Sequence, residues 1–118
     1  MCKIAVASQN LRTVTGHAGK TRRFLVYQVR PGSEPQEIER LDLPKEMSFH
    51  EFNDAEAHPL DGVQTLIVGS CGEGFVRRLA RRGIEVLATS ETDPIEAINE
   101  YLTGSLKPPL PHAHLPRS

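Results

Sequence analysis

The apolar residues of this 118-residue chain change their spacing about half-way along the sequence, and this change limits the possible folds more than any other feature. Residues 37–43 (EIERLDL) alternate between polar and apolar, which is typical of an antiparallel strand with one exposed face. Residues 65–68 (TLIV) form a continuous apolar run, which is typical of a parallel strand buried on both faces. The sequence therefore predicts an α/β protein with a mixed sheet.

Two helices and the remaining strands follow from the same patterns. A helix is predicted over 73–82, where apolar residues recur at helical spacing until Gly83 ends the pattern. A second helix over 94–103 begins after Asp93 as N-cap and with Pro94 as its first residue. The expected strands cover residues 3–8, 24–29, 36–43, 64–69 and 84–88. This order is a meander of three strands followed by strand–helix–strand–helix, so a right-handed crossover must join the two parallel strands.

The length corresponds to a single domain, because 118 residues and 13.1 kDa match the usual size of one hydrophobic core. We expect residues 1–106 to form one α/β domain. Residues 107–118 contain four prolines and are expected to form an extended, proline-rich C-terminal tail.

Composition and charge argue against several classes of function. The chain has 14 Lys and Arg against 15 Asp and Glu, a formal net charge of −1, whereas general nucleic-acid and membrane-surface binders need a strong basic excess. We find no apolar run long enough for a membrane span or a signal peptide. Two cysteines, Cys2 and Cys71, do not make a disulfide scaffold, so we expect a cytoplasmic protein.

Residues 15–21 (TGHAGKT) form the most informative loop of the sequence. Its end imitates a phosphate-binding P-loop, but Val14 stands where that motif needs glycine, and a strand rather than a helix follows. We therefore set nucleotide binding aside. What remains is His17 between Gly16 and Gly19, where a loop imidazole can ligate a metal or simply be solvated.

Cys71 lies in a glycine-rich turn between the buried strand and the following helix. Peptide dipoles and free N–H groups at a helix N-terminus lower the pKa of a nearby thiol, so we expect a reactive thiolate there. A small buried cysteine that only fills space is the alternative. The spacing from Cys71 to Arg77 is also C-x5-R, in which a thiolate attacks phosphorus and the arginine holds the phosphate oxygens. Against a phosphatase, Glu73 would place a carboxylate inside the phosphate cradle.

Four further histidines lie outside these two motifs. His112 and His114 are placed to share a metal in an extended tail, although histidines in a chain terminus more often have no ligand. His50 and His58 flank a middle segment that the sequence patterns do not explain.

Two segments together resemble one known family. The first is the glycine–histidine loop over 16–20, followed by a strand that begins at Phe24. The second runs from the strand at 63–69 through a glycine-bearing turn and a helix to an ending, A-I-x-x-Y-L-x-G-x-L, over 97–106. These features resemble the dinitrogenase iron–molybdenum cofactor family of NifX-like proteins. The resemblance covers residues 1–107.

The resemblance implies a ribonuclease-H-like α/β fold without nuclease activity and a protein that is not an enzyme. It also implies binding of an anionic iron–sulfur or iron–molybdenum-type cluster, a precursor of nitrogenase cofactor. The cluster would pass between an assembly scaffold and an acceptor protein. His17 matches the family's loop histidine, which is implicated in cluster binding, and Lys20 matches its basic neighbour. Ala18 departs from the family pattern, which usually has Phe at this position.

Chemistry rather than the resemblance brings in Cys71, because a soft thiolate suits iron–sulfur ligation. The expected cofactor-binding residues are His17, Gly16, Gly19, Lys20 and Cys71, with His17 and Cys71 as metal ligands. They converge only if their two loops lie at the same end of adjacent strands. Two alternatives stay open: a cysteine-dependent phosphatase or thiol enzyme that uses Cys71 and Arg77, and a protein-interaction module without a cofactor.

Overall fold

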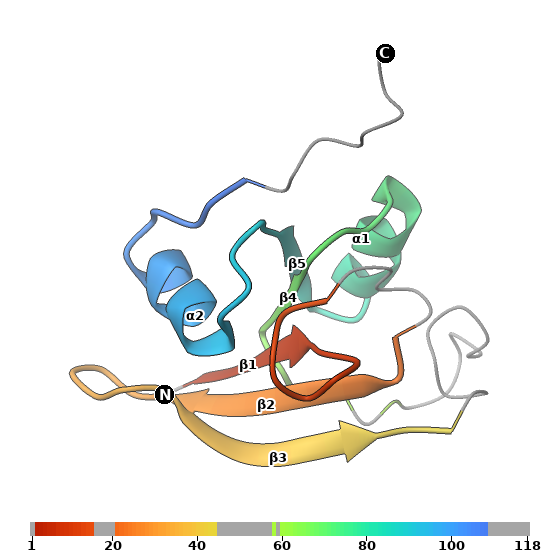
Figure 1. Cartoon of the computed structure of the whole chain (residues 1–118). Helices are drawn as coiled ribbons and strands as arrows, with labels where there is room; N and C mark the ends of the chain where they lie inside the picture. Colours follow the sequence, from red (N-terminus) through yellow and green to blue (C-terminus); the bar gives the residue numbers. More distant parts are fainter. Residues whose placement is uncertain (1, 16–20, 45–57, 59, 109–118) are drawn as a thin grey trace.

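The computed structural model describes residues 2–15, 21–44, 58 and 60–108 of the chain. These residues form a five-stranded sheet with one helix against each face (Figure 1). The elements are β1 (Cys2–Ala7), β2 (Arg23–Val29), β3 (Gln36–Asp42), β4 (Thr65–Val68), α1 (Glu73–Ala80), β5 (Glu85–Ala88) and α2 (Pro94–Leu102). Every expected strand and helix is confirmed, with ends that differ from the expected ones by at most two residues.

The sheet is mixed, as the change in apolar spacing predicts. Its order is β3-β2-β1-β4-β5. The pairs β3–β2 and β2–β1 are antiparallel, and the pairs β1–β4 and β4–β5 are parallel. Ala5 in the central strand pairs with Val26 on one side and Leu66 on the other. All four residues of β4 are buried, whereas β3 buries only Leu41. A continuous apolar run and an alternating one thus mark the two halves of the sheet.

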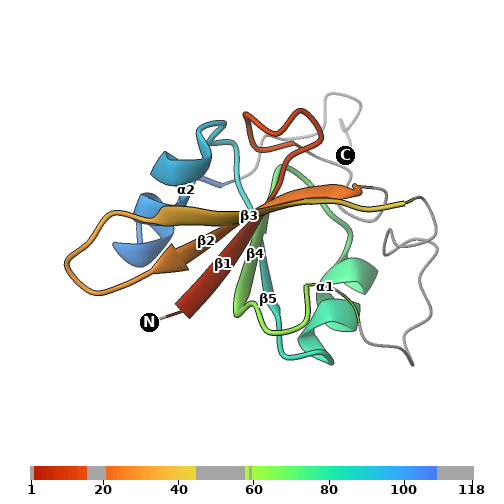
Figure 2. The same cartoon turned by 90° about the horizontal axis from the view of Figure 1, so that it is seen from below.

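Each helix covers one face of the sheet with its own hydrophobic cluster (Figure 2). On the α1 face, fully buried Leu79 packs with Phe24 and Leu66. On the α2 face, Ile98 packs with Ile67. Truncating a fully buried leucine or isoleucine to alanine typically costs about 2–5 kcal/mol of stability, so both clusters are needed to hold the sheet.

The two helices begin differently. The Oδ1 atom of Asp93 accepts hydrogen bonds from the backbone N–H groups of Ile95 (2.9 Å) and Glu96 (3.1 Å), which confirms the expected N-cap of α2. The N-cap of α1 is Gly72, which has no side chain to accept such bonds.

Gly83 follows the end of α1 with a φ of +80°, a left-handed conformation that favours glycine.

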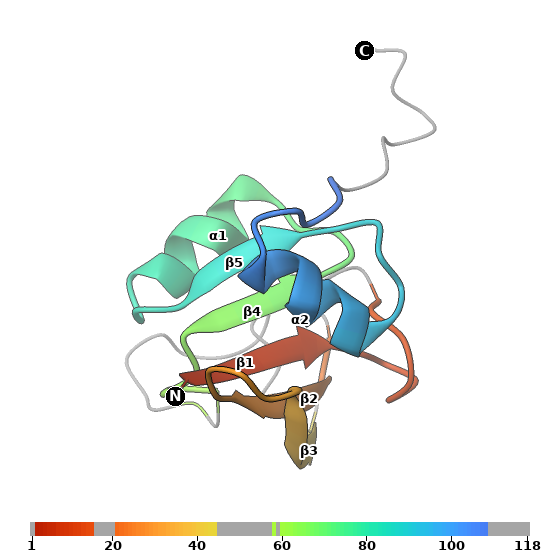
Figure 3. The same cartoon turned by 90° about the vertical axis from the view of Figure 1, so that its left-hand side faces the viewer.

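The chain after α2 runs toward the end of β5 (Figure 3). The backbone N–H of Ser90 donates to the carbonyl oxygen of Pro108 at 3.1 Å, so this segment lies beside the end of β5. Residues 109–118, the rest of the expected proline-rich tail, lie outside the described residues. Among the residues that the structure describes, no helix is long and apolar enough to cross a membrane.

Candidate functional site

The loops after β1, β4 and β5 meet at the carboxyl ends of the parallel strands. The backbone N–H of Thr15 donates to Ala7 at the end of β1 (2.9 Å), and the carbonyl of Thr15 accepts from Gly69 after β4 (2.8 Å). Val14 N–H donates to the carbonyl of Thr92 after β5 (2.9 Å). The loop after β1 is therefore bound to both neighbouring loops, and the three form one surface.

A side-chain network fixes the turn that starts the loop after β1. The Oδ1 atom of Asn10 accepts from the backbone N–H groups of Arg12 and Thr13, each at 2.9 Å. The hydroxyl of buried Ser8 donates to the carbonyl oxygen of Thr13 at 2.6 Å. Leu11 takes a φ of +58°, which is uncommon for a non-glycine residue. This network holds the turn in the conformation that delivers Thr15 to β4.

Gln9 holds both ends of the segment 16–20. Its backbone N–H donates to the Oγ1 atom of Thr15 at 3.0 Å, just before the segment. Its side-chain Oε1 accepts from the N–H groups of Arg22 (2.9 Å) and Arg23 (3.3 Å), just after it. Four of the expected site residues, Gly16, His17, Gly19 and Lys20, belong to this segment and lie outside the described residues. The structure thus fixes the base of the histidine loop beside β4.

Cys71 lies at the same end of the sheet, two residues before α1 begins. Its side chain is half-buried and packs against the α1-side cluster, as Phe75 and Val76 of α1 also do. This burial raises the pKa of the Cys71 thiol, because a charged thiolate is poorly solvated there. The expectation that a helix N-terminus would lower this pKa therefore has the wrong direction, because burial raises it.

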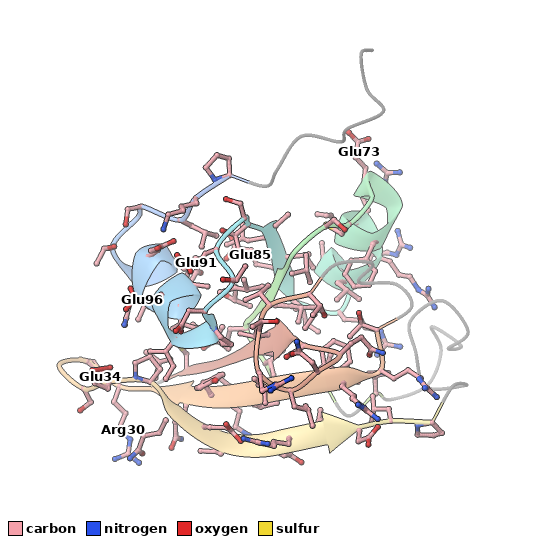
Figure 4. The ribbon with its side chains drawn as sticks, viewed as in Figure 1. Arg30, Glu34, Glu73, Glu85, Glu91 and Glu96 are labelled. Carbon is pink, nitrogen blue, oxygen red and sulfur yellow. The ribbon has the colours of Figure 1, made fainter. Side chains whose placement is uncertain are left out.

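The C-x5-R spacing does not form a phosphate cradle. Such a cradle needs a loop between the cysteine and the arginine, but α1 already begins at Glu73 and includes Arg77. The Arg77 side chain is 69% exposed and its Nη1 lies 3.8 Å from the Glu73 carboxylate on the helix surface. Figure 4 shows Glu73 at the start of α1. The arrangement therefore contradicts the phosphatase reading of Cys71 and Arg77.

The described residues contain no group of three or more His, Cys, Asp or Glu placed to hold a metal ion. His58 is buried, and its Nδ1 accepts from the backbone N–H of Leu60 at 3.1 Å. The backbone N–H of His58 donates to the Oδ2 atom of Asp61 at 2.8 Å, so this histidine organises the turn before β4. His50, His112 and His114 lie outside the described residues.

Lys107 ties the C-terminal segment to the loop after β5. Its Nζ lies 2.7 Å from Glu91 Oε1 and 2.5 Å from Glu100 Oε2. The other Glu91 oxygen accepts from the N–H groups of Thr92 and Asp93, each at 3.1 Å. The hydrogen bond from Lys107, followed by those from the backbone, lowers the pKa of the Glu91 carboxyl to about 2. This contact fixes one rim of the carboxyl-end surface.

Sequence reasoning missed the residues that build this surface. Gln9, Asn10 and Thr15 carry the hydrogen bonds that position the histidine loop, yet none was singled out from the sequence. The available signal was the run of short polar side chains after β1, since Ser, Thr and Asn often bond to the backbone of their own turn. The pairing of Lys107 with two glutamates had no local signal at all.

Comparison with known proteins places the chain in a family. The family model described as "Dinitrogenase iron-molybdenum cofactor" matches residues 1–104. The chain belongs to this family. Protein NifX of Azotobacter vinelandii is 28% identical to this chain over 115 residues, and the match covers 91% of this chain and 68% of NifX. The expectation drawn from the glycine–histidine loop and the C-terminal ending is confirmed.

Two solved structures have the same fold as this member of the dinitrogenase iron–molybdenum cofactor family. A putative NifB protein from Thermotoga matches with a TM-score of 0.60 and 20% identity, covering 96% of this chain and 99% of its own. The apo form of the orange protein from Desulfovibrio gigas matches with a TM-score of 0.62 and 20% identity, covering 100% and 98%. These likenesses extend over nearly the whole sheet and both helices.

Proposed function

We propose that this protein binds an iron–sulfur or iron–molybdenum-type cluster, a precursor of nitrogenase cofactor, and carries it without catalysing a reaction. A cytoplasmic assembly scaffold or acceptor protein would exchange the cluster with it. Membership of the dinitrogenase iron–molybdenum cofactor family and the similarity to NifX support this proposal. The single observation that carries it is the hydrogen bond of 2.8 Å between Gly69 and Thr15.

That hydrogen bond joins the histidine loop to the cysteine turn. His17 follows Thr15 by two residues, and Cys71 follows Gly69 by two residues. Two residues of extended chain span at most about 7 Å, so covalent geometry keeps both residues near the bonded pair. The anchor points support a shared site, because Thr15 and Gly69 are bonded to each other at the same end of the adjacent strands β1 and β4.

The proposed ligands are the imidazole of His17 and the thiol of Cys71. A neutral imidazole donates an electron pair to iron without adding negative charge to an anionic cluster. The raised pKa of Cys71 means that the free thiol keeps its proton, which iron would displace on binding. Two protein ligands leave other iron atoms open to an acceptor, which suits a protein that must release its cargo.

Three further residues of the histidine loop would assist. Gly16 and Gly19 would let the backbone approach a bulky guest closely, because glycine has no side chain in the way. Lys20 would attract the anionic cluster through its charge rather than by ligation, so its contribution would fall as salt screens it.

Anaerobic purification followed by iron and sulfide analysis tests the proposal. We expect a brown protein with visible absorbance, or a colourless one that gains this absorbance on incubation with ferrous iron and sulfide. A protein that takes up neither iron nor sulfide under these conditions would contradict the carrier function. It would instead support the interaction module without a cofactor.

A further inference from the structure

The two outer strands of the sheet are protected to different degrees. β3 carries Glu37, Glu39 and Arg40, and a bulge shifts its register with β2. Charged side chains and bulges both hinder the addition of another strand. β5 has one charged residue, Glu85, and within the described part of the chain it pairs only with β4 (Figure 3). The edge of β5 is therefore the one that can accept a further strand.

Val86 and Ala88 present the free backbone of this edge. The N–H groups of Glu85 and Thr89 donate to carbonyls on the β4 side, at 3.0 and 2.9 Å. Alternate residues of a strand point their backbone groups to opposite sides, so Leu87 also faces β4. The N–H and C=O groups of Val86 and Ala88 consequently point away from β4.

The chain itself limits the length of this open edge. At one end, Ile84 N–H donates to the carbonyl of Leu79 at 3.0 Å. At the other end, Ser90 N–H donates to the carbonyl of Pro108 at 3.1 Å. Ile84 and Ser90 belong to the same alternate series as the two free positions between them. The edge therefore has room for a short added strand, opposite residues 84–88.

An apolar groove runs beside the open edge on the α1 face. It has a volume of about 480 Å³ and is lined by Val76 and Ala80 of α1 and by residues 83–87. The Glu85 carboxylate accepts from the Tyr101 hydroxyl at 2.8 Å, which places this charge on the α2 face. The groove is therefore suited to apolar side chains from an added strand.

Two exposed arginines lie beside the groove on α1. Arg77 directly follows Val76 in the sequence, and Arg81 follows Ala80 in the same way. A helix with about 3.6 residues per turn places both arginines in the row next to the residues that line the groove. The contact of Arg77 with Glu73 spans 3.8 Å between largely exposed side chains, so it neutralises little of this charge. The groove therefore has a positively charged border.

We propose that the edge of β5 binds a short extended segment of a partner protein, which adds to the sheet as an antiparallel strand. Val86 and Ala88 exchange backbone hydrogen bonds with this segment. Residues paired directly with them share the α1 face, because both belong to the α1-side cluster. Apolar side chains of the segment therefore fill the groove, and the positive border selects a segment that also carries an acidic side chain.

The position of the acidic side chain follows from the path of the chain. The hydrogen bond between Ile84 and Leu79 brings the start of β5 to the end of α1, where Arg81 caps the helix. An antiparallel segment has its amino-terminal residues opposite Ala88 and its carboxyl-terminal residues opposite Ile84. The partner segment therefore has its apolar residues first and its acidic residue last.

A second copy of the chain fits this edge less well. Antiparallel pairing of two β5 strands would place two α1 helices side by side on the same face of a continuous sheet. Arg77 and Arg81 are exposed, so this pairing would bring like charges together. An acidic segment from a different protein meets attraction at the same place.

NMR titration of the full chain with the pentapeptide VTVTE, acetylated and amidated, tests the proposal. Its two valines lie opposite Ala88 and Val86, and its glutamate lies opposite Ile84. We expect the peptide to slow amide hydrogen exchange at Val86 and Ala88 and to leave exchange in β3 unchanged. The matched peptide VTVTK should bind about three- to tenfold more weakly at low ionic strength, because its charge is repelled.

Two N-methylated forms of VTVTE distinguish strand addition from other modes of binding. Methylation of both valines removes the N–H groups that face β5, whereas methylation of both threonines removes N–H groups that face away from it. We expect the first form to bind at least about tenfold more weakly than VTVTE, and the second to bind like VTVTE.

Substitutions of exposed arginines test the charge selection. Arg77→Gln with Arg81→Gln should bind VTVTE and VTVTK to within about twofold of each other. The matched control, Arg12→Gln with Arg30→Gln, removes the same charge from other parts of the surface and should keep the preference for VTVTE.

Three results would overturn the proposal. The first is equal binding of the two methylated peptides, or the opposite order. The second is an unchanged preference for VTVTE in Arg77→Gln with Arg81→Gln. The third is protection of Val86 and Ala88 in the full chain without peptide, which would show that the chain itself or a second copy occupies the edge. None of these measurements involves a metal cluster, so they test the docking surface separately from the carrier function.

Discussion

The two ends of the sheet each hold a half-buried cysteine, but their surroundings differ. Cys71 lies at the carboxyl ends of the parallel strands, where backbone hydrogen bonds join three loops. Cys2 lies at the opposite end, in a pocket of about 610 Å³ between α2 and the turn that follows β2. Arg30 and Glu34 mark that turn in Figure 4. A pocket therefore points to the end with Cys2 as the functional site, whereas the meeting of three loops points to the end with Cys71.

This difference shows how a parallel sheet makes a site. Parallel strands deliver successive loops to one end, so residues that are distant in sequence come together there. At the end with Cys71, Thr15 contacts Gly69, and Val14 contacts Thr92. The scaffold holds the loop ends, and the loops supply the chemistry. The following predictions test whether the two ends differ in function as they do in structure.

Removing each thiol in turn should give the largest difference in cluster binding between the two ends of the sheet. We expect Cys71→Ser to weaken the retention of a reconstituted iron–sulfur cluster by about 10–100-fold, the usual cost of disturbing a metal site. Cys2→Ser, the matched control, should bind like the parent. Anaerobic titration followed by visible absorbance measures both. Equal losses in the two variants would remove the distinction between the ends.

Removing the network that fixes the turn after β1 should destabilise the fold. We expect Asn10→Ala to lower the free energy of unfolding by about 1–2 kcal/mol, because two backbone N–H groups lose their acceptor. Asn99→Ala, on α2 at the opposite end, should change it by less than about 0.5 kcal/mol. Urea denaturation measures both. If the two variants are equally stable, the turn does not depend on its side-chain network.

The reactivity of Cys71 should follow its burial. In a Cys2→Ser background, we expect the alkylation rate of Cys71 to rise with a midpoint above about pH 8.5, the value for a free thiol. The physical reason is that burial disfavours the thiolate. A midpoint below that of a free thiol would show that the helix N-terminus outweighs burial and would restore the reactive-thiolate prediction.

The contact between Lys107 and Glu91 should make the stability of the folded state depend on pH in the acidic range. Because the pKa of Glu91 is lowered from 4.5 to about 2, its ionised form stabilises the folded state. This contribution is complete above about pH 4.5 and is lost as the pH falls toward 2. Lys107→Met should flatten the fall in melting temperature over this range, whereas Lys3→Met should not. Parallel acid profiles for parent and Lys107→Met would contradict the assignment.

The fold could be predicted from the sequence because its signals are local. The spacing of residues 37–43 and 65–68 set the two kinds of strand, and Asp93 set the start of α2. The site could be predicted only in part. The sequence pointed to Cys71 as a candidate site residue but predicted the wrong direction for its pKa shift, because burial comes from tertiary packing. The anchoring role of Gln9 depends on residues 13 and 14 positions away, which no local pattern contains.

Titration of the anaerobic apo-protein with a preformed cubane iron–sulfur cluster tests the carrier function most directly. The variants to compare are His17→Ala and His114→Ala. Each removes one histidine, but only His17 belongs to the histidine loop. The account predicts that His17→Ala weakens binding by about 10–100-fold at every salt concentration, while His114→Ala binds like the parent. Binding by His17→Ala that is as tight as in the parent would contradict it.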